Sequence, residues 1–146
     1  MEAHFPGSTG VKRKFAIEII ELEPEVTTNA GLPDVNVTGY VVSHPSGTPS
    51  LALRVDCDGK ILSYTGDTEW VDAVATAASG ADLLIAECYT YERPVRFHLN
   101  YQTLREKLPE IGARRVLLTH MSPDMLDRLP ALTDCEAASD GLQIVV

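Results

Sequence analysis

The chain has 146 residues, of which 45% are hydrophobic and 23% charged, and its formal net charge is −9. This length and composition fit one globular domain over residues 1–146, and no apolar run approaches the length of a membrane span. The negative charge disfavours broad binding to nucleic acid, which the short basic triplet Lys12-Arg13-Lys14 does not offset.

The cysteines and the N-terminal residues indicate the cellular compartment. Cys57, Cys88 and Cys135 form neither a CxxC metal pattern nor a disulfide framework. The N-terminus lacks a basic start followed by an apolar core, so no signal peptide is visible. We therefore predict a protein of the reducing cytoplasm that does not associate with membranes.

The first half of the chain predicts antiparallel strands. Apolar and polar residues alternate in several short runs that are separated by turn residues. Asp58-Gly59 lies between two of these runs and predicts a tight hairpin, because both residues tolerate positive backbone angles. The predicted strands are Phe15–Leu22, Val35–Ser43, Ser50–Asp56 and Ile61–Tyr64.

The second half predicts alternating helices and buried strands. Asp67 or Thr68 would cap the first helix and Asn100 the second. Helical spacing and caps predict helices at Val71–Ser79, Leu99–Leu108 and Ser122–Leu129. Apolar runs predict strands at Asp82–Ala86, Arg115–Thr119, Thr133–Ala138 and Leu142–Val146, the last two joined by an Asp140-Gly141 hairpin. The sum is a mixed α/β fold with helices packed on a sheet.

Four ionisable residues share one topological position. His44, Asp67, Glu87 and His120 each come at or just after the end of a predicted strand. Strand ends along one edge of a sheet bring such side chains together, and imidazole and carboxylate groups suit zinc, manganese or iron. Each residue also has a plain structural interpretation: a hydrogen-bonded loop histidine, a helix cap or a paired carboxylate.

Five segments resemble, in this order, the C-terminal half of a metallo-β-lactamase-fold hydrolase of the branch that includes ribonuclease Z and cyclic-phosphate phosphodiesterases. They are Val41-Val42-Ser43-His44, Tyr64-Thr65-Gly66-Asp67-Thr68, Ala81-Asp82-Leu83-Leu84-Ile85-Ala86-Glu87, Phe97-His98 and Val116-Leu117-Leu118-Thr119-His120-Met121. The resemblance implies one half of an αββα sandwich, a mixed sheet with helices on one face.

The resemblance also implies roles for particular residues. His44, Asp67 and His120 match metal ligands, with Asp67 bridging two ions. His98 matches a histidine that assists catalysis near the scissile phosphate, and Glu87 partly matches a glutamate of the same branch. Asp67, Glu87 and His98 would therefore carry the catalysis, with zinc, manganese or iron as cofactor. A metal-activated water would hydrolyse a phosphodiester or another small-molecule substrate.

One part of the family pattern is missing. The chain contains no HxHxDH motif and no His-x-His, and His4 is isolated. We therefore expect weak or absent metal binding by this chain alone, with little activity. An uncovered sheet face would favour a homodimer or pairing with an N-terminal half. Two alternatives remain: a non-catalytic half-domain that makes protein contacts, and an unrelated α/β binding module.

Smaller features near these residues allow two interpretations each. Tyr89, Tyr91 and Tyr101 would either line a substrate pocket or pack in the core. Arg93 and Arg96 precede His98 and would either meet a substrate phosphate or lie on the surface. Cys88 is interpreted as a buried thiol.

Overall fold

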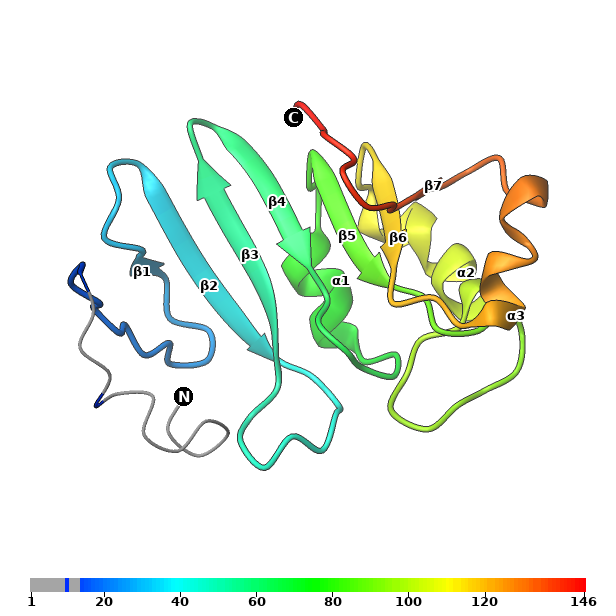
Figure 1. The fold of residues 1–146 in the computed structure, drawn as a ribbon, viewed down its shortest axis with the longest axis horizontal. Coiled ribbons are helices and arrows are strands. Elements are labelled where there is room, and N and C mark those ends of the chain that lie inside the picture. Colours follow the sequence, from blue (N-terminus) through cyan, green and yellow to red (C-terminus); the bar gives the residue numbers. More distant parts are fainter. Residues whose placement is uncertain (1–9, 11–13) are drawn as a thin grey trace.

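The computed structural model describes residue 10 and residues 14–146 (Figure 1). Within this part, strands β1 to β7 form one sheet in sequence order. β1 to β4 are antiparallel neighbours, whereas β4 to β7 run parallel. The strands are β1 (Thr28–Asn29), β2 (Val35–Val41), β3 (Leu51–Cys57), β4 (Lys60–Tyr64), β5 (Leu83–Glu87), β6 (Val116–Thr119) and β7 (Glu136–Ala137).

The predicted hairpin between β3 and β4 is confirmed. Asp58 and Gly59 have φ angles of 50° and 73°, as a type I′ turn requires. The turn aligns Cys57 opposite Lys60 and so fixes the register of both strands.

The helices are α1 (Asp72–Ala78), α2 (Tyr101–Ile111) and α3 (Pro123–Leu126), followed by a short 3-10 turn at Leu129–Ala131. None in the described part is long and apolar enough to cross a bilayer. The cap of α2 is confirmed, because the Asn100 side chain accepts the N–H of Thr103 at 2.9 Å. The predicted caps of α1 are wrong: its N-cap is Val71, and no side chain caps it.

The helices α1 and α2 lie on one face of the sheet, as predicted (Figure 1). Leu84, Leu104 and Leu118 are fully buried between the parallel strands and α2. Val74 of α1 packs in a second cluster with Ala52 of β3. The core therefore lies between the sheet and this single helical layer.

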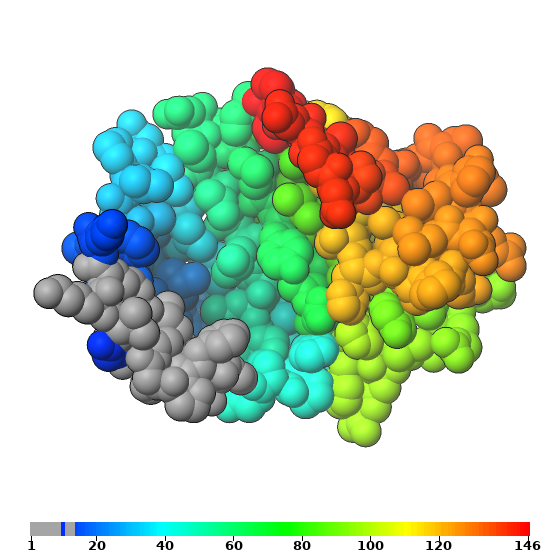
Figure 2. Space-filling model, in the orientation of Figure 1, coloured from blue at the N-terminus to red at the C-terminus, as the bar shows by residue number. Residues whose placement is uncertain are grey.

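The opposite face of the sheet is apolar, and we call it the open face. In the part of the chain that the structure describes, no helix or second sheet covers it; Figure 2 shows the C-terminal segment crossing only part of it. Val41 and Tyr64 remain 50% and 42% exposed. Register places the following side chains on this face: Val35, Val37, Val41, Leu51, Leu53, Val55, Leu62 and Tyr64.

The predicted first strand, Phe15–Leu22, is wrong. This segment has no strand partner, and Phe15 and Ile19 are 69% and 62% exposed. Its β-branched composition suits a strand, but composition does not supply a pairing partner. The outer edge of β2 pairs instead with Pro24, opposite Gly39, and with Thr28 of β1, opposite Val37.

The predicted C-terminal hairpin is also wrong. β7 is short and pairs in parallel with β6, and Leu142–Val146 is not a strand. The turn at Asp140-Gly141 closes through the Leu142 N–H and the Ser139 carbonyl at 3.1 Å, but the chain does not return along β7. Instead, the Arg115 guanidinium donates to the Val145 carbonyl at 3.1 Å.

Asp82 joins three segments where β5 begins. Its Oδ2 accepts the N–H of Ile61 at 3.0 Å, and its Oδ1 lies 2.9 Å from Arg114 Nη1 and 3.9 Å from Lys60 Nζ. The Ile61 N–H, and then the charges of Arg114 and Lys60, hold the pKa of Asp82 below its usual value. The ionised form is therefore favoured in the folded state.

We expect Asp82→Asn to lower the free energy of unfolding at neutral pH. A depressed pKa stabilises the fold above the unfolded value of 3.8, and this contribution is lost as the pH falls through the folded value. The deficit should therefore shrink in acid, measured by urea unfolding across pH. Asp140→Asn, in an exposed turn, is the control and should show no such pattern. A deficit that stays constant into acid would contradict the assignment.

Candidate metal centre

The candidate site lies at one edge of the sheet, where β4, β5 and β6 have their C-terminal ends (Figure 1). Asp67 follows β4, Glu87 ends β5 and His120 directly follows β6. β2 is antiparallel to β3, which is antiparallel to β4, so β2 ends at the same edge and delivers His44 there. The shared edge brings together segments that are distant in sequence.

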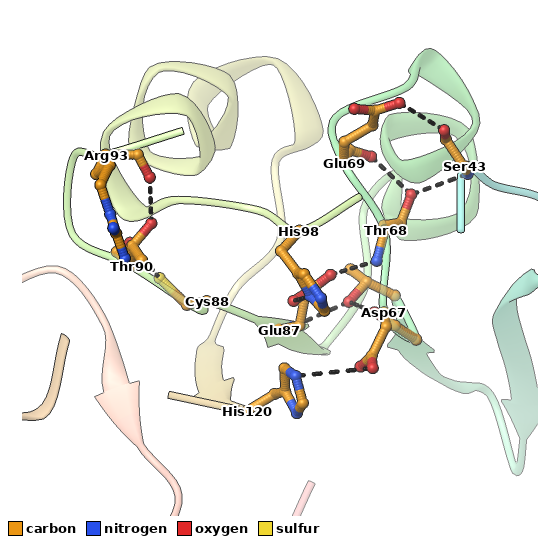
Figure 3. A network of polar contacts seen from close by, with 12 residues as sticks. Ser43, Asp67, Thr68, Glu69, Glu87, Cys88, Thr90, Arg93, His98 and His120 are labelled. Atoms are coloured by element: carbon orange, nitrogen blue, oxygen red, sulfur yellow. Dashed lines mark hydrogen bonds and ion pairs between the residues drawn. The ribbon is translucent and has the colours of Figure 1, made fainter. Parts of the chain in front are cut away.

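Ser43 joins the His44 loop to the Asp67 turn (Figure 3). Its N–H donates to Thr68 Oγ1 at 3.0 Å, and its hydroxyl donates to Glu69 Oε1 at 2.6 Å. The Glu69 N–H returns a bond to the Ser43 carbonyl at 3.3 Å. The two segments are therefore held side by side.

Glu87 is fully buried at the centre of the site. Its Oε1 accepts the Thr68 N–H, and its Oε2 lies 2.9 Å from His98 Nδ1. Its own N–H donates to Thr65 Oγ1 at 2.9 Å. Burial raises the pKa of Glu87, and the bonds from Thr68 and His98 oppose that rise. Since both carboxylate oxygens are engaged, Glu87 is suited to orienting His98 rather than to binding a metal.

The donor atoms form two groups spaced closely enough to hold a metal ion, although in the second group both Glu87 oxygens are already engaged. His44, Asp67 and His98 offer atoms that all lie within 4.8 Å of one another, and so do Glu87, His98 and His120. His120 Nε2 also lies 3.7 Å from Asp67 Oδ2. Imidazole and carboxylate donors at such spacing match the chemistry of zinc sites. All five residues predicted from the sequence thus lie in one cluster.

The grouping differs in one respect from the sequence expectation. His98, predicted as a catalytic residue, belongs to both donor groups, whereas His44 and His120 do not share one. The sequence contains no signal for this, because His98 lies at the end of an irregular loop rather than after a strand. Sequence reasoning also missed Thr65 and the Thr68 backbone as partners of Glu87.

Two residues at the site have a left-handed backbone. His120 has a φ of 52°, and Phe97, directly before His98, has a φ of 67°. This conformation costs a non-glycine residue about 1–2 kcal/mol. Both imidazoles are therefore placed by backbone geometry that the fold has to impose.

The structure distinguishes between the two interpretations of the residues near the site. Cys88 is a buried thiol whose pKa burial raises to about 12, so it is no ready metal ligand. Tyr91 stacks on Tyr101 at 5.3 Å in the core, whereas Tyr89 lies against His98 and His120. The remaining sequence candidates are placed as follows: Arg96 lies 4.4 Å over the Phe97 ring, Arg93 is exposed, and His4 falls outside the described residues.

Residues 2–121 match the family described as the Beta-lactamase superfamily domain, and the chain belongs to this family. It is 32% identical over 105 residues to an uncharacterized protein of Mycobacterium leprae, covering 69% of this chain and 36% of the relative. It is 31% identical over 115 residues to ribonuclease Z of Lactococcus lactis, covering 70% and 37%. The chain thus spans just over a third of the length of these relatives.

Solved structures show the same fold. The metallo-β-lactamase fold protein YhfI from Bacillus subtilis matches with a TM-score of 0.69 and 23% identity, covering 94% of this chain and 58% of that one. Zn²⁺-bound PqqB from Methylobacterium extorquens matches with a TM-score of 0.66 and 15% identity, covering 86% and 55%. The chain therefore has a metallo-β-lactamase fold over its own length, which confirms the fold expected from the sequence.

Gly66 allows the turn that presents Asp67. Its φ is 60°, and a Cβ there would lie 3.2 Å from the Leu51 carbonyl oxygen. Gly59 is a matched control, because its φ is 73° but a Cβ would meet nothing within 4 Å.

We expect Gly59→Ala to cost about 1 kcal/mol of unfolding free energy from backbone strain alone. Gly66→Ala should cost more, because the Leu51 backbone must also shift, and that shift should move Asp67. Urea unfolding of both variants measures the difference. Equal losses of unfolding free energy in the two variants would mean that the close approach to Leu51 does not affect stability.

Proposed function

We propose that this chain forms one side of a metal-dependent hydrolase site that cleaves phosphodiesters of small molecules. The ligands that we assign are His44, Asp67 and His120, and the catalytic residues are Asp67, Glu87 and His98. The single observation that carries the proposal is the cluster of imidazole and carboxylate donors around the buried Glu87–His98 contact.

The substrate class rests on similarity and on charge. Ribonuclease Z of Lactococcus lactis, a relative at 31% identity, is by its name an enzyme that cleaves RNA and hence phosphodiesters. The net charge of −9 favours a small substrate over a long polyanion. Because the chain spans 37% of that relative, the activity of the whole relative is not carried over directly.

Glu87 and His98 act as a proton-transfer pair in this proposal. In this proposal Glu87 Oε2 accepts the Nδ1–H of His98, 2.9 Å away, which fixes the ring and leaves Nε2 for the substrate. Protonated at Nε2, His98 donates that proton to the leaving oxygen as its bond to phosphorus breaks. Water, oriented by Asp67, forms the new bond to phosphorus and releases a proton to the solvent.

The metal supplies the remaining chemistry. Zinc, manganese or iron, when bound, lowers the pKa of a coordinated water so that a nucleophile exists near neutral pH. Catalytic zinc sites usually have three protein ligands. If two ions share His44, Asp67 and His120, each has too few ligands from this chain. We therefore propose that binding by this chain alone is weak and that its activity is low.

We expect zinc titrated into the isotope-labelled chain to shift the NMR signals of the His44 and His120 rings. Asp67→Asn should weaken this binding about tenfold or more, since even indirect partners of a metal site contribute 10–100-fold. Asp140→Asn, far along the chain in an exposed turn, is the control and should bind like the parent chain. Zinc that shifts no histidine signal would overturn the metal assignment.

His98→Ala separates the two possible roles of His98. A histidine that donates one ring N–H to a carboxylate is typical of zinc ligands as well as of proton donors. A proton donor predicts that His98→Ala retains zinc affinity but loses hydrolysis of bis(p-nitrophenyl) phosphate. A parallel loss of zinc affinity would make His98 a ligand instead.

The open face favours a second role, in contact with another protein chain, in addition to catalysis. It presents apolar side chains along β2, β3 and β4, with Val41 half exposed. Surfaces of this kind are typical of interfaces. The longer relatives contain residues outside the matched third of their length, and those residues are available to cover the open face. In the purified chain we propose that a second copy covers it instead.

We expect the purified chain to sediment as a concentration-dependent dimer. Leu53→Lys introduces a charge on the open face and should shift the equilibrium to monomer. Glu106→Lys, exposed on α2 behind the sheet, changes charge in the same direction and should leave the dimer intact. A parent chain that stays monomeric at all concentrations would contradict self-association through this face.

A further inference from the structure

We infer that Tyr89 is a positioning residue that holds the imidazoles of His98 and His120 in one stacked arrangement. The effect of Tyr89 on metal affinity rests on the proposed function. The packing of the three rings is independent of that function, because it follows from contacts within the chain. Tyr89 follows β5 two residues after Glu87, so it lies at the centre of the same edge.

The backbone of Tyr89 connects both histidine-bearing segments. Its N–H donates to the carbonyl of Leu99, the residue after His98, at 2.9 Å. Its carbonyl accepts the N–H of Ser122, two residues after His120, at 2.9 Å. One residue therefore sets the separation of two segments that the sequence keeps apart.

The side chain of Tyr89 contacts both imidazoles. The ring centroids lie 4.8 Å from His98 and 5.5 Å from His120, with interplanar angles of 32° and 29°. The two imidazoles are themselves stacked at 5.3 Å with an angle of 19°. These separations lie within the range of favourable aromatic contacts. The three rings thus form one mutually packed group.

Apart from Tyr89 and each other, His98 contacts Glu87 and the edge of the His44 ring, and His120 approaches Asp67. His98 is fixed at Nδ1 by Glu87, which still allows the ring plane to tilt about that contact. The His120 side chain is 43% exposed and approaches Asp67 only at 3.7 Å. Exposed side chains exchange rotamers freely, so the plane of His120 is restricted by the rings of Tyr89 and His98 that stack on it.

Tyr91 provides a matched control on the same segment. It lies two residues further on and stacks on Tyr101 at 5.3 Å, and the Arg128 guanidinium lies 5.2 Å from its ring. None of its ring contacts among the described residues involves a histidine. Replacing Tyr91 therefore removes a comparable aromatic contact without touching the site.

The test uses NMR of the metal-free chain with labelled histidine. In the parent chain and in Tyr89→Phe we expect strong cross-relaxation between the His98 and His120 rings and ring-current-shifted imidazole protons. Tyr89→Leu should lose both signatures while its amide spectrum stays dispersed, and Tyr91→Leu should keep them. Should Tyr89→Leu not fold, Tyr89→Met is the substitute, because Met adapts to irregular space.

Two results would overturn the inference. One is a folded Tyr89→Leu or Tyr89→Met variant with unchanged histidine signatures. The other is a Tyr89→Phe variant that loses them as fully as Tyr89→Leu, since that would assign the effect to the hydroxyl and not to the ring.

Zinc titration of the same samples separates this inference from the proposed function. We expect Tyr89→Leu to weaken zinc binding about tenfold, as loss of an outer-shell partner does, and Tyr89→Phe to retain it. Histidine signatures that depend on Tyr89 in a parent chain without zinc affinity would support the positioning role and reject the metal site.

Discussion

The site depends on one buried carboxylate. Burying a charge is costly unless hydrogen bonds compensate it, and Glu87 is compensated by groups from two other segments. The Thr68 N–H comes from the turn after β4, and the His98 imidazole comes from the loop before α2. Each partner satisfies Glu87 only if its segment is in place. The carboxylate therefore couples the folding of the strand ends to the geometry of the site.

Local patterns predicted much of the fold. The hairpin at Asp58-Gly59, the Asn100 cap and the buried strands β5 and β6 depend on chemistry that neighbouring residues carry, and the structure has all of them. The wrong strands, Phe15–Leu22 and Leu142–Val146, have suitable composition, but neither pairs with the terminal strands β1 and β7 of the sheet. Pairing along an edge depends on the whole sheet, which no local window contains.

Strand ends likewise predicted where the site residues would gather, because a parallel sheet aligns its C-terminal ends whatever the intervening sequence. Two features of the site could not be predicted from the sequence. Thr65 and Thr68 hold Glu87 through one hydroxyl and one backbone N–H, and these common groups have no distinctive pattern. The stacking of Tyr89 on two imidazoles follows from loop conformations, and loops obey sequence rules less closely than strands do.

The left-handed backbone at His120 and at Phe97 has an evolutionary consequence. Selection for stability alone would favour glycine at both positions, since glycine adopts these angles without a steric penalty. Glycine at 120 would thus gain stability but would remove the imidazole there. Histidine at 120 therefore keeps an imidazole at this edge of the sheet at an energetic cost to the fold.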